Sequence, residues 1–103
     1  MTGMVRFEWD EAKAESNLRK HGIDFDDAIE VFYDPHAVCE QNRVVDGEVR
    51  WQTIGMAGDV VVLQVAHTVT EQNFDEVIRI ISARRATRKE RRRYGQNYTK
   101  SLG

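Results

Sequence analysis

The chain has 103 residues, which is enough for one compact domain with its own core but too few for two. Hydrophobic residues make up 41% of it and there is a single proline, so the composition excludes a disordered chain. The net charge of -2 hides a segregation, because residues 1–48 carry 5 basic and 12 acidic side chains whereas residues 49–103 carry 10 and 5. The basic half indicates a polyanionic partner, and the acidic half indicates a basic partner or simple solubility.

The cysteine content and the hydropathy pattern predict the cellular compartment of the protein. Cys39 is the only cysteine, so no intrachain disulfide is possible, and the first residues lack the apolar stretch of a secretory signal. The longest apolar runs, such as residues 60–63, are far shorter than the roughly 20 residues that cross a bilayer. We therefore expect one domain over residues 1–103, in the reducing cytoplasm and without a membrane span.

The first 35 residues predict one strand and two helices. Residues 5–9 alternate apolar and polar side chains as a short strand does, and Asp10 stands where a helix cap is needed. Gly22 ends this first helix. A second helix follows, and Asp34-Pro35 ends it.

The rest of the chain predicts a meander and a final helix. A polar loop over residues 70–75 leads into a β-branched strand that is apolar on both faces and is therefore expected to be central. The elements predict an α+β fold of the order β-α-α-β-β-β-α, with a small antiparallel sheet, helices packed on one side and a frayed tail over residues 95–103. The expected strands are residues 37–45, 48–56, 60–69 and 76–85, with turns at Asp46-Gly47 and Gly58-Asp59, and the final helix is residues 86–94.

The residue types available for chemistry are few. The three histidines are scattered and Cys39 has no neighbour at ligand spacing, so we expect no metal site and no cofactor. No glycine-rich phosphate loop or nucleophile elbow is present. Arginines, one or two histidines and a few carboxylates remain, and this inventory fits RNA cleavage without a metal. In such a reaction the ribose 2′-oxygen attacks the adjacent phosphate, so a proton acceptor, a proton donor and fixed cations are needed.

Three residues are the leading candidates. His67 lies near the end of a strand and has an ordinary pKa near ~6.5, although a lone histidine on a strand is more often structural. Glu76 opens the next strand, and a hairpin would bring it to His67 as base or orienter; the alternative is a solvated charge. Arg79 stands among apolar residues and needs a counterion or a ligand, which is a substrate phosphate or a carboxylate such as Glu76.

Further arginines surround these candidates. Arg50 is expected to point at the same site. Arg84 and Arg85 leave their strand on opposite faces, so one of the two faces the site. Strict alternation puts Arg79 with Arg85, and Glu76 with Arg84, but a bulge would reverse this.

The final helix carries a run of positive charge. Such a run is usually a solvated face, but its density here favours contacts with phosphates. Tyr94 either stacks on a base or anchors the helix, and we favour anchoring. The basic residues of the run are Arg88, Lys89, Arg91, Arg92 and Arg93.

Two segments resemble the BrnT family of type II toxins, and the resemblance covers about residues 5–94. It is carried by FEWDEAKAESNLRKHGIDFDDAIEVF near the start and VIRIISARRATRKERRRY near the end. The specific positions are Trp9, Asp10, Lys13 and Asn17, the KHG of residues 20–22, and the RIISAR of residues 79–84.

The resemblance implies a RelE-like ribonuclease that arrests growth by cutting RNA. It also implies neutralisation by a BrnA-like antitoxin whose own DNA-binding domain represses the shared promoter, and a toxin dimer within a heterotetramer. The expected catalytic residues are Arg50, His67, Glu76, Arg79 and Arg84, and the expected RNA-binding residues are Arg85, Arg88 and Arg92.

Two functions of different classes fit these patterns. The first is a metal-independent endoribonuclease. The second is a non-catalytic module that binds nucleic acid or an acidic protein through the basic final helix. A DNA-binding regulator fits less well, because the final helix has no second helix with which to form a helix-turn-helix.

Overall fold

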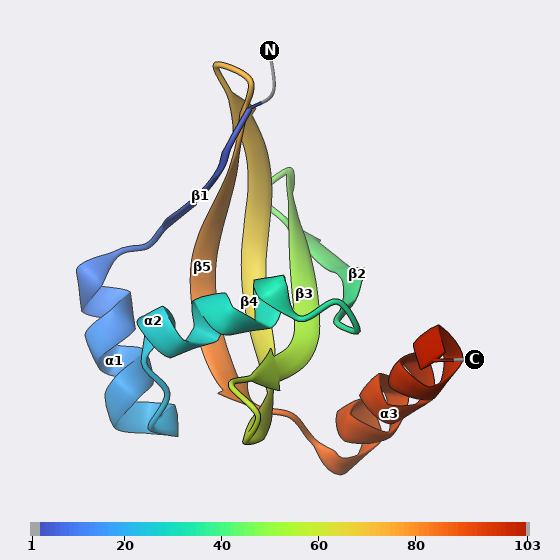
Figure 1. Cartoon of the computed structure of the whole chain (residues 1–103). Coiled ribbons are helices and arrows are strands. Elements are labelled where there is room, and N and C mark those ends of the chain that lie inside the picture. Colours follow the sequence, from blue (N-terminus) through green and yellow to red (C-terminus); the bar gives the residue numbers. More distant parts are fainter. Residues whose placement is uncertain (1–2, 103) are drawn as a thin grey trace.

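The structure, a computed structural model, describes residues 3–102 and contains one five-stranded sheet with helices on both of its faces (Figure 1). The predicted order β-α-α-β-β-β-α wrote only three strands after the helices, whereas the structure has four there, at the four ranges where strands were expected. No helix within residues 3–102 is long and apolar enough to cross a membrane. The elements are β1 (Val5–Glu8), α1 (Glu11–His21), α2 (Phe25–Ala28), the 3-10 helix η1 (Ile29–Tyr33), β2 (Val38–Val45), β3 (Glu48–Ala57), β4 (Val61–Gln72), β5 (Asp75–Arg85) and α3 (Arg88–Leu102).

The strands lie in the order β1-β5-β4-β3-β2. Strands β2 to β5 form antiparallel hairpins, as predicted. The β1 strand is the exception, because it pairs with β5 in parallel, with Val5 opposite Glu76. This pairing gives β5 a neighbour on each side, so its apolar character on both faces matches an interior position.

Helix α1 has the ends that the sequence predicts. The Asp10 side chain accepts a hydrogen bond from the Lys13 backbone N–H at 3.1 Å, and Gly22 adopts a left-handed conformation with φ of 71°. Between these caps, the buried Asn17 side chain donates to the Ala83 carbonyl at 2.8 Å and accepts from the Ala83 N–H at 3.1 Å. The helix is thereby tied to β5 beyond the point where β1 ends.

The predicted second helix consists of a single α-helical turn, α2, followed by the 3-10 helix η1, which ends just before Asp34. It crosses one face of the sheet (Figure 1). The crossing is close at Gly55, where an added Cβ atom would lie 3.0 Å from the Val31 carbonyl oxygen. Glycine at this position therefore lets η1 pack directly on the sheet.

Two tight turns fix the hairpins. Asp46 and Gly47 have φ values of 50° and 78°, as expected for the predicted Asp-Gly turn. The polar loop predicted over residues 70–75 is instead the end of a long hairpin, in which β4 continues to Gln72 and β5 begins at Asp75. Asn73 and Phe74 make the turn, with φ of 50° and 71°.

The core is divided between the two faces of the sheet, so the prediction of helices on one side only is wrong. Helices α1, α2 and η1 cover one face, which we call the helix face, over a cluster that includes Phe25, Val31, Leu63 and Ile80. Helix α3 lies on the opposite face, where Tyr94 packs against the Ile54 and Ala86 cluster.

Helix α3 is longer than its apolar content suggests. The Glu90 carboxylate accepts from the Thr87 N–H at 2.8 Å, and Thr87 Oγ1 accepts from the Glu90 N–H at 3.2 Å, which is a capping box. The frayed tail predicted from residue 95 is replaced by helix up to Leu102, and Gly103 lies outside the described residues.

Candidate functional site

One irregularity in the β4–β5 pairing decides which side chains share a face. Ala66 lies opposite Ser82 but His67 lies opposite Ile80, so β5 holds one extra residue at this point. Strict alternation is therefore broken. Arg79 shares a face with Arg84, on the side of the sheet that carries α3.

We call the side of the sheet opposite the helix face the arginine face. A row of side chains crosses its open part, because Arg43 is the register partner of Arg50 and Thr68 is the partner of Arg79. Arg50 and Thr68 fall at adjacent positions of β3 and β4, since their neighbours Trp51 and His67 are partners. Three guanidinium groups from three strands are thus aligned across the buried Thr68. The row consists of Arg43, Arg50, Thr68 and Arg79.

A single carboxylate serves two of these arginines. Arg79 Nη2 donates to Glu48 Oε1 at 2.8 Å, and Arg50 Nε lies 3.4 Å from the same oxygen. The second contact is an ion pair without hydrogen-bond geometry, so the buried Arg50 Nε has no hydrogen-bond acceptor among the described residues. The row therefore carries three positive charges against one negative charge, with an unused N–H donor at its centre.

Arg79 differs from its sequence prediction in its surroundings. We expected a guanidinium buried among apolar side chains, but the Arg79 side chain is 44% exposed. Its flanking isoleucines point to the helix face and the arginine itself points to the solvated side. Its counterion is Glu48, not Glu76 or an aspartate.

His67 does not lie beside the arginines. It is 1% exposed on the helix face, its Nε2 atom lies 2.8 Å from Thr53 Oγ1, and its ring packs edge-on against Phe32. Burial lowers the pKa of His67 below its ordinary value, so the buried ring is neutral at pH 7. Glu76 shares this face and lines the same small cavity, but its cross-strand partner is Glu71 while that of His67 is Ile80, so the hairpin does not place Glu76 directly opposite His67.

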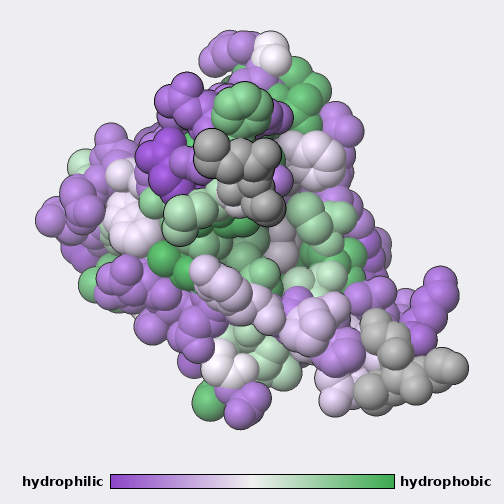
Figure 2. Space-filling model, turned by 45° about the horizontal axis from the view of Figure 1, so that its top comes forward, coloured by the Kyte–Doolittle hydropathy of each residue, from purple (hydrophilic) through white to green (hydrophobic). Residues whose placement is uncertain are grey.

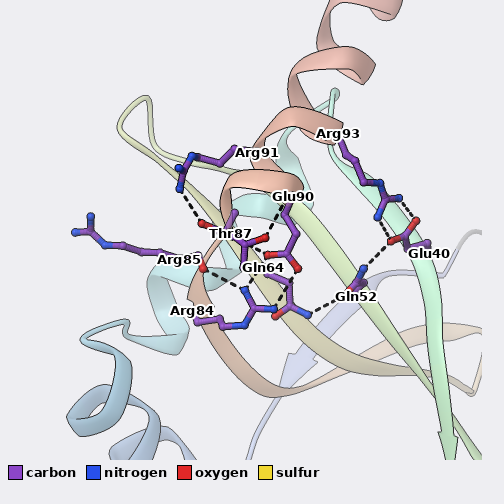
Figure 3. A network of polar contacts seen from close by, with 10 residues as sticks. Glu40, Gln52, Gln64, Arg84, Arg85, Thr87, Glu90, Arg91 and Arg93 are labelled. Atoms are coloured by element: carbon purple, nitrogen blue, oxygen red, sulfur yellow. Dashed lines mark hydrogen bonds and ion pairs between the residues drawn. The ribbon is translucent and has the colours of Figure 1, made fainter.

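Arg84 is held by a carboxylate of α3. Its Nη1 and Nη2 atoms donate to the two oxygens of Glu90 at 2.8 and 3.1 Å (Figure 3). These hydrogen bonds raise the pKa of Arg84 and lower that of Glu90. Since Glu90 also closes the capping box, Arg84 fixes where α3 leaves the sheet, and it is a positioning residue in this structure.

A second polar chain joins α3 to the middle of the sheet. Gln64 donates to Gln52 at 3.0 Å and Gln52 donates to Glu40 at 2.6 Å (Figure 3). Arg93 completes the chain with a two-pronged contact to the same carboxylate, and this contact lowers the pKa of Glu40. Arg93 therefore helps to hold α3 against the sheet.

Tyr94 anchors the helix, as predicted. Its hydroxyl donates to Asp34 Oδ2 at 2.7 Å, and the backbone N–H groups of Met56 and His36 also donate to this carboxylate. Burial alone would raise the pKa of Asp34, but these hydrogen bonds lower it overall. Burial and the hydrogen bond to Asp34 raise the pKa of Tyr94.

The residues expected to contact RNA are exposed and have no ion-pair partner among residues 3–102. Arg88 and Arg92 lie one helical turn apart on α3. Arg85 is opposite Leu63 of the helix-face core and its side chain points away from the network in Figure 3. Arg85 is thus separated from the arginine row, whereas Arg88 and Arg92 are on the helix that lies on the arginine face.

Sequence reasoning missed Glu48 and Arg43. The first could have been found, because the predicted Asp46-Gly47 turn fixes the β2–β3 register and places Glu48 two residues before Arg50 on one face. Arg43 could not, since a second register shift between Gln41 and Arg43 determines its partner.

Within the described residues, no group of three His, Cys, Asp or Glu side chains is arranged to hold a metal ion. The single cysteine, Cys39, is exposed and lines the same cavity as His67 and Glu76. The side chains that gather on the arginine face are guanidinium and carboxylate groups, which can supply electrostatic and acid–base chemistry.

Comparisons with known proteins agree on one family. The sequence model of a family described as the ribonuclease toxin BrnT of type II toxin-antitoxin systems matches residues 9–90. Among solved structures, the chain is similar to the 1.1 Å crystal structure of the Brucella abortus ribonuclease toxin BrnT, with 25% sequence identity and a TM-score of 0.57. That match covers 84% of this chain and all of the Brucella chain. No curated protein matches.

Proposed function

The chain belongs to the BrnT family of ribonuclease toxins of type II toxin-antitoxin systems, and we propose that it cleaves RNA without a metal ion on its arginine face. The observation that carries this proposal is the row of Arg43, Arg50 and Arg79, three guanidinium groups with one carboxylate between them. A phosphodiester is the ligand that such a row suits best. A planar guanidinium donates two parallel hydrogen bonds to its oxygens.

The charge balance of the row favours an added anion. Glu48 neutralises one of the three guanidinium groups, and the buried Nε of Arg50 still lacks an acceptor. A phosphate bound between Arg43 and Arg79 would supply the negative charge that the row lacks. The exposed Arg88 and Arg92 of α3 would then contact neighbouring phosphates of the same strand.

The proposed reaction transfers the phosphate within the RNA. The ribose 2′-oxygen attacks the adjacent phosphorus and loses its proton, the bond to the 5′-oxygen breaks, and that oxygen gains a proton. Glu48 is the carboxylate nearest to the row and is the proposed proton acceptor. Arg50 and Arg79 stabilise the charge that develops on the phosphorane oxygens. The products are a 2′,3′-cyclic phosphate and a 5′-hydroxyl.

The test is RNA cleavage in the presence of EDTA, with the product ends identified by mass spectrometry. We expect Arg79→Ala and Arg50→Ala to lower the cleavage rate by about 10²- to 10³-fold each, the usual cost of removing one donor to a transition-state oxyanion. Glu48→Gln keeps the shape of the side chain but removes the proton acceptor, so it should lower the rate and flatten its dependence on pH.

The matched control is Arg19→Ala, which removes an equally exposed arginine from α1 on the helix face and should leave cleavage unchanged. Full cleavage by Arg79→Ala would contradict the proposed site. RNA binding that disappears with salt, with no cleavage at any protein concentration, would instead favour the non-catalytic module.

The family also suggests the biological setting. We propose that induced expression arrests growth and that a BrnA-like antitoxin relieves the arrest. The toxin would act in the cytoplasm as a dimer within a heterotetramer, and it would reach promoter DNA only through the antitoxin. The antiparallel strands and flanking helices support a RelE-like relationship for the fold.

A further inference from the structure

Apolar surface remains open on the helix face, beyond the part that the helices cover. In Figure 1, α1, α2 and η1 cross the lower half of the sheet while the β4–β5 hairpin extends past them. The exposed fractions are 51% for Val5, 39% for Val69, 76% for Phe74 and 73% for Tyr33. We call this surface, formed by these four residues, the apolar trough.

The trough is hollowed and not flat. A cavity of about 190 Å³ lies between Phe32, His67 and Ile78, and a wider hollow of about 430 Å³ lies beside Phe74. Val69 and Glu76 line both, so the two hollows adjoin each other, and neither is lined by a lysine or an arginine. Figure 2 shows apolar surface in the middle of this side of the molecule, bordered by hydrophilic side chains.

An unbalanced pair of negative charges lies in the same place. Glu71 and Glu76 are direct cross-strand partners, and neither has an ion-pair partner among residues 3–102. Like charges placed opposite each other in an antiparallel pair destabilise the hairpin. An added positive charge at this position would remove that cost, so the hairpin is complementary to a cationic group.

These properties select one kind of occupant. RNA is disfavoured, because its phosphates would meet two carboxylates. A second copy of this chain is disfavoured as well, since a symmetric contact would bring two Glu71–Glu76 pairs together. A protein segment with apolar side chains and a lysine or arginine fits both the hollows and the charge.

We propose that the apolar trough binds a basic, apolar segment of the cognate antitoxin, an inference that rests on the proposed function. The trough and the arginine row lie on opposite faces of the sheet. A segment bound in the trough would therefore hold the toxin without covering the arginine row.

The experiment measures binding of the purified protein encoded by the open reading frame adjacent to this gene, by titration calorimetry against the full-length toxin. Phe74→Asn removes the ring while suiting the left-handed turn, and Glu71→Lys reverses one charge of the pair. We expect each to weaken binding by about tenfold or more, as for a central interface residue. Glu15→Lys, an exposed charge reversal on α1, is the matched control and should bind as the wild type does.

RNA cleavage is measured on the same variants and should be unchanged, which separates this proposal from the proposed function. Absence of cleavage by the wild type would contradict the ribonuclease mechanism while leaving the binding comparison intact. Wild-type affinity in both trough variants would overturn the trough proposal. Loss of RNA cleavage in either trough variant would also overturn the trough proposal. The same holds if the wild type is a dimer and Phe74→Asn converts it to a monomer.

Discussion

Replacing His67 with glutamine would separate the structural role of this residue from the catalytic role that the sequence suggests. The ring is 1% exposed, and burial lowers its pKa below the ordinary value of 6.5. As the pH falls through 6.5, the unfolded chain takes up a proton at His67 and the folded chain resists it. The unfolded state then binds more protons, so the stabilising contribution is complete above pH 6.5 and is lost progressively below it.

Only one proton is taken up at His67, and this limits how much the free energy of unfolding can change with pH. The free energy of unfolding changes by at most about 1.4 kcal/mol per pH unit for one titrating group, so about 1.4 kcal/mol is the upper limit between pH 6.5 and 5.5. The free energy of unfolding of a typical domain is roughly 5–15 kcal/mol, so a change of this size is measurable. Glutamine does not titrate, so the variant should lose this slope. Above pH 6.5, imperfect packing against Phe32 should make the variant about 1–2 kcal/mol less stable than the wild type, and this difference should narrow below pH 6.5.

The assay is urea unfolding followed by circular dichroism at pH 5.5, 6.5 and 7.5, with RNA cleavage measured at pH 7.5. The carboxylates with lowered pKa, such as Asp34 and Glu90, have ordinary values of 3.8 and 4.5 and act mainly below this window. We expect cleavage by His67→Gln to stay within about twofold of the wild type. A loss of 100-fold or more in a stably folded variant would refute our placement of the reaction on the arginine face, and an unchanged pH slope would refute the linkage argument.

Three further predictions concern α3. Tyr94→Phe should lower the free energy of unfolding by about 1 kcal/mol, because the partly buried Asp34 carboxylate loses one donor. In the wild type, ultraviolet titration should show one tyrosine that ionises well above pH 10. Glu90→Gln should weaken both the Arg84 contact and the capping box, so amide exchange in the first turn of α3 should increase. Arg92→Ala should leave folding unchanged but lower the slope of log affinity for RNA against log salt by about 1; an unchanged slope would place RNA elsewhere.

The parts of the fold that depend on nearby residues were predictable from the sequence. Asp10 and Gly22 bound α1 because a cap needs only its own turn of helix. The Asp46-Gly47 turn was found for the same reason. The length of α3 was missed because the capping box of Thr87 and Glu90, together with the Tyr94 anchor, stabilises a helix whose composition is almost wholly polar.

The parts that depend on distant pairing were not predictable. Nothing local indicates that β1 pairs with β5 in parallel, since the two strands are about seventy residues apart. The candidate site depended on face assignments, and a single extra residue near Ile81 reversed them. His67 and Arg79 were predicted to meet because they lie on neighbouring strands. Each strand, however, alternates its side chains between the two faces of the sheet, and these two residues point to opposite faces.

The register of the β4–β5 hairpin gives the sheet its chemical division. The hairpin turn places Arg79 opposite Thr68, on the side of Arg50, and places Glu76 opposite Glu71 on the other side, and the bulge then brings Arg84 to the side of Arg79. One face thus gathers excess guanidinium groups and the other an uncompensated carboxylate pair, although the whole chain has a net charge of only -2. A polyanion and a basic protein segment are then sorted to opposite faces by charge alone. Removing the extra residue of β5 would exchange the faces of Ser82 to Arg85 relative to Arg79. Such a deletion should therefore separate Arg84 from Glu90 and impair RNA cleavage, whereas substitutions within the apolar trough should impair only partner binding.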